Sequence, residues 1–236
     1  LQAVNSGVIP EGWNTTTIVL IPKVDNPERI TQFRPISLCN VVYKVISKML
    51  ASRLKLLLPD VISETQSAFV PGRIITDNVI VAYECLHTMK KRKSGKVGTC
   101  AVKLDMHKAY DRVEWIFLEQ MLAKYGFGTE WIAMIMRCVT SATFTVNLNG
   151  GLSRRFVPSR GLRQGDPLSP YLFLFCVEGF SALLKQAQQE GSLKGVAFGS
   201  TGPQVTHLLF ANDSVVFLEG TRQNMEALKV ILQRYE

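Results

Sequence analysis

Two aspartates in this sequence stand at the ends of segments that are expected to form β-strands. Asp105 directly follows the apolar segment Thr99–Leu104, and Asp213 lies between two apolar runs in Val205–Leu218, which reads VTHLLFANDSVVFL. The apolar side chains on both sides of Asp213 predict a buried β-hairpin with the aspartate at its tip. Because an ionised carboxylate there needs compensation, a cation, a basic side chain and a hydrated turn are all open explanations.

Carboxylates on neighbouring strands are what two-metal phosphoryl transfer requires. Two Mg²⁺ ions about 4 Å apart are bridged by such carboxylates, one ion activating the attacking oxygen and the other stabilising the leaving pyrophosphate. We therefore expect Asp105 and Asp213 to converge on adjacent strands of one sheet. On spacing alone, an ordinary turn remains the alternative for Asp213, because Asn and Asp are common turn residues.

Composition limits the class of protein. The chain has 236 residues, of which 47% are hydrophobic and 19% charged, which is typical of a globular protein with one large domain or two lobes. The longest apolar run, Tyr171–Val177, is too short to cross a bilayer and no signal-peptide pattern is present, so we expect an intracellular protein without membrane contact. The formal net charge of +8 predicts a polyanionic partner.

The cysteines and the chain ends lead to two further predictions. The cysteines are five in number and form no C-x-x-C pair, so they support neither zinc nor disulfides and are expected to be reduced, mostly buried thiols. The sequence begins without methionine and stops inside an amphipathic pattern. We expect it to be a piece cut at both ends.

Periodicity and turn residues predict the remaining elements. The expected strands are 15–22, 99–104, 143–148 and 153–157, and the expected helices are 41–58, 76–88, 111–125, 129–141 and 169–189. Pro59 is predicted to end the first helix, and Asp111 to cap the third with Glu114 three residues later. Asn149-Gly150 predicts a hairpin turn. Lys23–Arg34 is interpreted as a polar loop, and the basic run Lys90–Lys96 as a solvated turn.

Strands and helices alternate without a regular βαβ rhythm, which predicts an α+β fold on an antiparallel sheet. The residues around the two aspartates also resemble the sequence motifs of a known family. Three blocks resemble, in this order, the palm motifs of reverse transcriptases: VKLDMHKAYDRVEW (Val102–Trp115), GLRQGDPLSPYLF (Gly161–Phe173) and LLFANDSVVF (Leu208–Phe217). Three upstream blocks narrow the resemblance to plant-like non-LTR (LINE-type) retrotransposons: LIPK (Leu20–Lys23), FRPISL (Phe33–Leu38) and QSAFVPGR (Gln66–Arg73).

The resemblance covers nearly the whole chain and implies a right-hand polymerase. It implies a fingers subdomain at about residues 1–98 and a palm subdomain at 99–236, with the family's thumb, endonuclease and later palm motifs missing from this sequence. It also implies an RNA-directed DNA polymerase that uses an RNA template, a DNA primer, deoxynucleoside triphosphates and Mg²⁺.

Individual residues match the family's site. Asp105 corresponds to the metal ligand of the first motif, and Tyr110 to the aromatic beneath the nucleotide sugar, whose bulk would exclude a 2′-hydroxyl. The alternative for Tyr110 is a core aromatic. Arg163, Gln164 and Gly165 correspond to the second motif, which the resemblance implies is nucleotide-binding. Gln164 would contact the incoming nucleotide, and the glycine would let the backbone approach template or base closely.

Two basic residues resemble the fingers side chains that meet the triphosphate. They are Lys23 and Arg34, and a guanidinium suits phosphate because it can bind two oxygens at once. The alternative is a structural role, since an arginine before proline in a polar loop is often only structural.

The third motif departs from the family. Asn212 stands where F-A-D-D has its principal aspartate, so Asp105 and Asp213 are the two carboxylates left for two dications. We expect catalysis to be absent or strongly impaired. Three hypotheses remain: an impaired polymerase domain, a nucleic-acid-binding relic that does no chemistry, and the translation of an unexpressed pseudogene.

Overall fold

The computed structural model describes residues 8–91, 97–198 and 202–235, and the chain divides into two compact units. Unit 1 comprises Leu1–Leu56 and Lys108–Phe173, and unit 2 comprises Leu57–His107 and Leu174–Glu236. Their boundaries fall inside two long helices and just after residue 107. The expected division into fingers and palm at residues 98 and 99 lies within unit 2 and stays a prediction.

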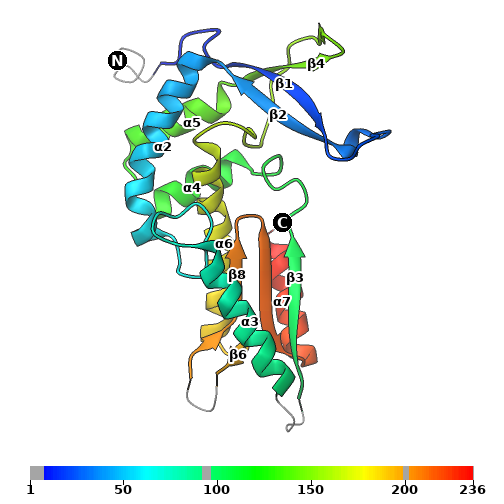
Figure 1. Cartoon of the computed structure of the whole chain (residues 1–236). Coiled ribbons are helices and arrows are strands. Elements are labelled where there is room, and N and C mark those ends of the chain that lie inside the picture. The colour runs from blue at the N-terminus through cyan, green and yellow to red at the C-terminus, as the bar shows by residue number, and fades with distance from the viewer. Residues whose placement is uncertain (1–7, 92–96, 199–201, 236) are drawn as a thin grey trace. The chain divides into compact units, whose positions relative to one another are not determined.

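Unit 1 contains a four-stranded sheet with the order β2-β1-β4-β5 (Figure 1). Strands β1 and β2 are antiparallel, whereas β1 and β4 are parallel. Helix α4 packs against α5. The elements of this unit are β1 (Thr15–Pro22), η1 (Ile30–Gln32), β2 (Phe33–Cys39), most of α2 (Val41–Val61), α4 (Trp115–Lys124), α5 (Thr129–Thr140), β4 (Thr143–Leu148), β5 (Gly151–Leu152) and the first turn of α6 (Ser169–Gln189).

Unit 2 contains the predicted antiparallel sheet, with the order β3-β9-β8. Figure 1 shows α3 crossing one face of this sheet, and Cys85 of α3 packs there with Leu208 and Phe217. A separate two-stranded sheet pairs β6 with β7. Besides the rest of α2 and α6, the elements are α3 (Ile75–Lys91), β3 (Thr99–Asp105), β6 (Val196–Ala197), β7 (Gln204–Val205), β8 (His207–Phe210), β9 (Asp213–Glu219) and α7 (Arg222–Tyr235).

Several local predictions are confirmed. Strand β1 has the expected bounds, and α3, α5 and α6 lie within a few residues of theirs. Asn149 and Gly150 both have positive φ, +51° and +85°, as a two-residue turn of the Asn-Gly type requires. All five cysteines are free.

Among the residues described, no helix has the length and apolarity to span a bilayer.

Two helix boundaries were predicted wrongly. Helix α2 continues past Pro59 to Val61, because a proline in the last turn removes only its own hydrogen bond and Ile62 N–H still donates to the Leu58 carbonyl at 2.9 Å. Asp111 does not cap a helix.

Helix α4 begins only at Trp115, with Glu114 at its N-cap. Asp111 N–H donates to the Lys108 carbonyl at 2.9 Å, so the chain is still turning there. The expected capping glutamate instead pairs with Arg160 at 3.0 Å.

Two strand predictions also need correction. The expected strand 153–157 is not continuous, because the pairing of β5 with β4 shifts by one residue before Phe156 forms a bridge with Phe144, as in a β-bulge. Strand β2 begins at Phe33, within the segment interpreted as a loop. The predicted turn at Lys90–Lys96 lies mostly outside the described residues, and Lys90 and Lys91 belong to α3.

Candidate active site

The two aspartates meet on adjacent strands of unit 2. In the antiparallel pairing of β3 with β9, Asp105 is the direct partner of Asp213, which confirms the predicted convergence. Directly opposed residues project to the same face of a sheet with Cβ atoms about 5 Å apart. Asn212 lies in the two-residue turn before Asp213, and its backbone carbonyl accepts a hydrogen bond from Met106 N–H at 3.3 Å. The chain thus gathers the two predicted metal ligands and the degenerate catalytic position Asn212.

The turn is held from a neighbouring segment by Gln66. Its Oε1 accepts hydrogen bonds from Ala211 N–H at 3.1 Å and from Ala68 N–H at 2.9 Å, and Gln66 forms a parallel bridge with Leu209. Ala211 has a φ of +57°, which is uncommon for alanine, so the turn needs such support. The sequence showed Gln66 only as part of a resembling block, and its separation of 145 residues from Ala211 hid the role.

The donor set fits a hard divalent cation. Asp105 and Asp213 supply anionic oxygens, and Asn212 can add neutral carbonyl oxygens. Among the described residues, no group of three or more His, Cys, Asp and Glu side chains could hold a metal. Mg²⁺ suits such a sparse set, because it commonly keeps several waters and takes one or two carboxylates together with substrate phosphates.

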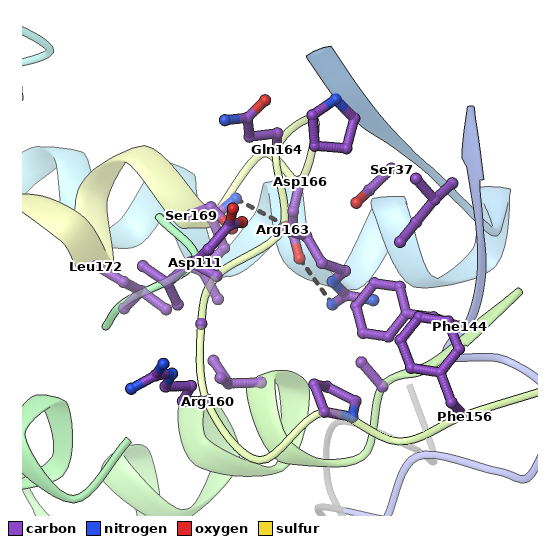
Figure 2. Close-up of a pocket in the computed structure, with 18 residues that line it drawn as sticks. Ser37, Asp111, Phe144, Phe156, Arg160, Arg163, Gln164, Asp166, Ser169 and Leu172 are labelled. Atoms are coloured by element: carbon purple, nitrogen blue, oxygen red, sulfur yellow. Dashed lines mark hydrogen bonds and ion pairs between the residues drawn. The ribbon is translucent and has the colours of Figure 1, made fainter. Parts of the chain in front are cut away.

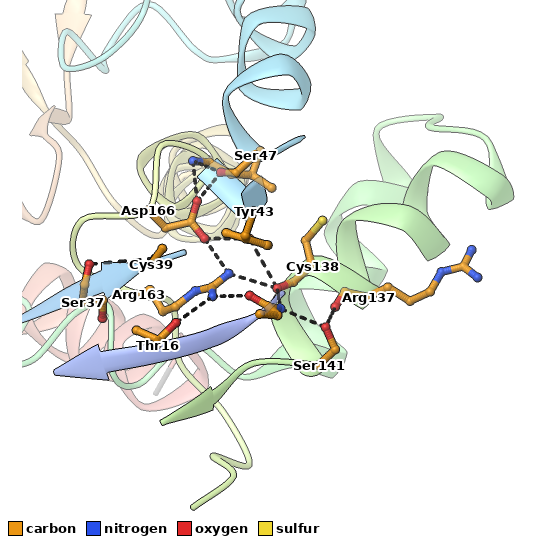
Figure 3. Close-up of polar contacts among 12 residues, drawn as sticks. Thr16, Ser37, Cys39, Tyr43, Ser47, Arg137, Cys138, Ser141, Arg163 and Asp166 are labelled. Carbon is orange, nitrogen blue, oxygen red and sulfur yellow. Dashed lines mark hydrogen bonds and ion pairs between the residues drawn. The ribbon is translucent and has the colours of Figure 1, made fainter. Parts of the chain in front are cut away.

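A second group of predicted residues lies in unit 1, on the loop between β5 and α6. Arg163 is the buried centre of that loop (Figure 3). Its guanidinium donates to Thr16 Oγ1 at 3.1 Å, to the Cys138 carbonyl at 3.1 Å and to Asp166 Oδ2 at 2.7 Å. A further hydrogen bond runs to Asn14 Oδ1. These contacts indicate that Arg163 positions the loop; its predicted direct contact with a nucleotide stays a prediction.

The carboxylate of Asp166 is as fully engaged as the guanidinium. It accepts hydrogen bonds from the Tyr43 hydroxyl at 2.7 Å, from Leu168 N–H at 3.0 Å and from the Ser47 hydroxyl. The Arg163 guanidinium also stacks over the Tyr43 ring at 4.1 Å. Burial raises the pKa of the Tyr43 phenol well above its usual value, and the Asp166 carboxylate raises it further, so the hydroxyl remains a donor. Sequence reasoning did not single out Asp166.

Gln164 and Gly165 pass directly over strand β2. Ser37 N–H donates to the Gln164 carbonyl at 2.7 Å. Gly165 has a φ of +109°, and a Cβ there would lie 2.9 Å from the Ser37 carbonyl oxygen. The close approach at this glycine is to the protein's own strand. The predicted approach of its backbone to template or base stays a prediction.

Gln164 also borders a pocket of about 170 Å³ within unit 1. Figure 2 shows Gln164 and Arg160 at opposite ends of the lining, with Phe144 and Phe156 on one side. The two rings stack with centroids 5.7 Å apart. Asp111 contributes to the polar part of the lining. The pocket thus combines an aromatic wall with a few polar groups, as small-ligand sites commonly do.

Tyr110 is half-buried and packs against another aromatic side chain. Its ring stacks on Phe173 with centroids 5.1 Å apart and an interplanar angle of 15°, and its carbonyl accepts a hydrogen bond from Leu162 N–H at 2.8 Å. Burial raises the pKa of its phenol to about 12. Tyr110 is therefore a neutral, fixed aromatic in the segment between β3 and α4. Its predicted role beneath the nucleotide sugar stays a prediction.

Lys23 and Arg34 lie at the turn end of the β1–β2 pair. Lys23 Nζ donates to the Thr31 carbonyl at 3.2 Å, and its N–H donates to Gln32 at 2.8 Å. Arg34 is exposed and pairs in register with Ile21. Both cations are on the surface, where phosphate could reach them. Their predicted binding to the triphosphate stays a prediction.

Comparison with known proteins defines first the fold and then the family. Telomerase from Candida tropicalis, solved in complex with a fragment of telomeric RNA, matches 96% of this chain and 40% of its own, with a TM-score of 0.60 and 16% identity. At that identity the likeness shows the fold alone, which is the mixed α/β fold of reverse transcriptases. The family described as reverse transcriptase (RNA-dependent DNA polymerase) matches residues 21–236, and the chain belongs to this family.

The curated relatives include proteins of non-LTR retrotransposons, which confirms the resemblance seen in the sequence. The 149 kDa protein of transposon TX1 from Xenopus laevis is 32% identical over 91% of this chain, and the Pol polyprotein of element R2DM from Drosophila melanogaster is 30% identical over 94%. The matched region is 16% of the first protein and 20% of the second. The plant-like branch stays a prediction.

Proposed function

We propose that this chain is the nucleotidyl-transfer region of an RNA-directed DNA polymerase from a non-LTR retrotransposon, impaired by Asn212. The observation that carries the proposal is the register of β3 and β9, which sets Asp105 directly opposite Asp213 in a chain of the reverse-transcriptase family. Its proposed substrates are an RNA template, a DNA primer and deoxynucleoside triphosphates.

In this proposal Asp105 and Asp213 hold divalent metal ions, which reverse transcriptases generally use. When bound, such ions make the attacking oxygen more nucleophilic and stabilise the leaving pyrophosphate. The chain's own residues do the positioning. Gln164 contacts the incoming nucleotide, and Tyr110 supports its sugar and excludes a 2′-hydroxyl. Lys23 and Arg34 bind the triphosphate, because both side chains are exposed and carry cations suited to phosphate.

Asn212 sets the expected level of activity. Asparagine keeps the shape of aspartate and one carbonyl oxygen but not the charge, so the ions are held by two carboxylates. If the lost charge removes about 3 to 5 kcal/mol of transition-state stabilisation, the rate falls by roughly 10² to 10⁴-fold. The chain can nevertheless fold normally, because Asn212 lies in a partly exposed turn whose backbone contacts do not use its side chain.

The proposed enzyme is tested by primer extension on poly(rA) with oligo(dT). The unchanged chain and Asn212→Asp are compared at equal concentration, with Asp105→Asn as the inactive control. We expect Asn212→Asp to exceed the parent by roughly 10²-fold or more where extension is measurable. Extension by the parent that equals Asn212→Asp would contradict the proposed impairment.

A nucleic-acid-binding relic is the second candidate, favoured by the net charge of +8 together with Asn212. Binding to an RNA–DNA hybrid should then be mostly electrostatic, and log K should fall linearly with log salt. Hybrid binding with this salt dependence, combined with no extension even by Asn212→Asp, would favour the relic over the polymerase.

A further inference from the structure

A lysine lies beside the aspartate pair. Lys103 stands two residues before Asp105 on β3, so both side chains project to the same face as Asp213. Lys103 pairs in register with Val215, which makes Asp213 its diagonal neighbour, a spacing that a long side chain can bridge. The Lys103 Nζ lies 3.5 Å from Asp213 Oδ1. A cation of the chain itself therefore sits on one of the two carboxylates.

This ion pair is open to water. The Lys103 side chain is 73% exposed and that of Asp213 is 45% exposed, so the contact is weak and the lysine can swing away. In contrast, Arg163 and Asp166 are locked inside unit 1 by several hydrogen bonds each. The lysine contact is thus displaceable.

The lysine also changes the charge that an incoming ion meets. Two carboxylates and one ammonium leave the group with a single net negative charge, because Asn212 contributes none. Replacing Lys103 by a neutral residue and replacing Asn212 by Asp each make the group more negative by one charge. Either change should favour a dication over the apo form.

We propose that Lys103 is an internal counter-cation that a divalent metal ion must displace from Asp213. The inference rests on the proposed function, since it assumes that the aspartate pair binds such ions. It gives Lys103 a defined role: it stabilises the two facing carboxylates while no ion is bound, and it weakens metal affinity by competing for Asp213.

The test is the affinity for Mn²⁺, measured by electron paramagnetic resonance of the free ion and by calorimetry. Lys103→Met should bind Mn²⁺ about two- to fivefold more tightly than the parent, the range expected for losing competition from one exposed ion pair. Lys103→Arg keeps the charge and should bind like the parent. Lys229→Met removes the same charge from an exposed position on α7 and serves as the matched control.

Salt separates a charge effect from a steric one. Competition by an exposed ammonium is screened, so the advantage of Lys103→Met should shrink between about 0.01 M and about 1 M NaCl. An advantage that stays constant over this range would overturn the electrostatic proposal.

Asp213→Asn distinguishes the failure of this inference from that of the proposed function. If Mn²⁺ binding is lost in Asp213→Asn while Lys103→Met binds no more tightly than Lys229→Met, the ion site stands and the role of Lys103 is overturned. If no variant, Asn212→Asp included, shows binding that depends on Asp213, the ion site itself is overturned, and the inference with it.

Discussion

Two ion pairs that each contain one predicted site residue are built in opposite ways. Arg163 and Asp166 lie 2.7 Å apart with side chains only 5% and 4% exposed, whereas Lys103 and Asp213 lie 3.5 Å apart in water. A buried pair cannot lose one member without leaving an uncompensated charge, but an exposed pair can exchange its partner. The first therefore fixes the shape of the loop that carries Gln164, and the second leaves Asp213 available for another cation.

Removing one negative charge from a buried and from an exposed ion pair tests this difference most directly. Asp166→Asn should lower the free energy of unfolding by about 3 to 5 kcal/mol, because it strands the Arg163 guanidinium in the interior. Glu114→Gln removes the exposed partner of Arg160 and should cost less than about 1 kcal/mol. Urea denaturation of both variants measures the difference. Equal losses would show that the buried pair is not essential to stability.

At the base of the β8–β9 hairpin a polar side chain is buried and hydrogen-bonded, as in the cluster around Arg163, whereas Asp213 at the tip is partly exposed. His207 is buried on β8, where its Nε2 lies 2.8 Å from Ser181 Oγ and its Nδ1 lies 2.9 Å from Thr206 Oγ1. Burial, and to a smaller extent the charge of Lys185, lower the pKa of His207 to about 4. Folding thus keeps this imidazole neutral.

Acid should therefore destabilise the protein through His207. The unfolded chain takes up a proton below the ordinary histidine pKa of about 6.5, so the contribution present above that pH is lost as the pH falls towards 4 and amounts to about 3 kcal/mol at most. Denaturation at a series of pH values, for the parent and for His207→Gln, measures it. The difference in unfolding free energy between the two should shrink from pH 7 to pH 4.

Glu178 also changes the unfolding free energy with pH, but in the opposite direction to His207. Burial raises its pKa in the folded state, so its contribution is present at low pH and is lost as the pH rises through the raised value. Both proteins carry Glu178, and it therefore cancels in the comparison. A difference that is independent of pH would contradict the predicted state of His207.

Much of the local structure could be predicted from the sequence. Strand β1, which is rich in Thr, Ile and Val, and the Asn149-Gly150 turn were identified because strand propensity and turn chemistry are local properties. The convergence of Asp105 with Asp213 was also predicted, because two-metal phosphoryl transfer needs paired carboxylates and the resembling palm motifs imply them.

The supporting contacts could not be predicted in the same way. Tyr43 lies 123 residues from Asp166, and Gln66 lies 145 residues from Ala211, so no periodic pattern connects them. Asp111 was misinterpreted for a different reason: its spacing to Glu114 imitates a capping box, but Arg160 binds the glutamate from outside the local segment. In each case a long-range partner decided the outcome.

Gly165 tests the buried side of the comparison with a smaller change. Gly165→Ala should cost about 1 to 3 kcal/mol, since the backbone is held at a φ of +109° and the new Cβ would meet the Ser37 carbonyl oxygen. Gly150→Ala is a control, because its φ is also positive while no atom lies within 4 Å of the added Cβ. Thermal unfolding compares the two. A cost equal to that of Gly150→Ala would mean that the close approach to β2 adds nothing beyond the backbone conformation.

Asn212→Asp should have the smallest effect on folding and tests the exposed side. The substitution keeps the side-chain volume and leaves the backbone contact with Met106 in place, so the unfolding free energy should change by less than about 0.5 kcal/mol without metal. The direction should be towards lower stability, because Asp105 and Asp213 repel the new charge and Lys103 offsets only part of it. Added Mg²⁺ reverses the order: a ligand that binds only the folded state stabilises it in proportion to its affinity, and a third carboxylate raises that affinity. The melting temperature of Asn212→Asp should therefore rise more with Mg²⁺ than that of the parent. Equal responses would mean that position 212 does not face the ions, and the exposed site would then owe its metal affinity to Asp105 and Asp213 alone.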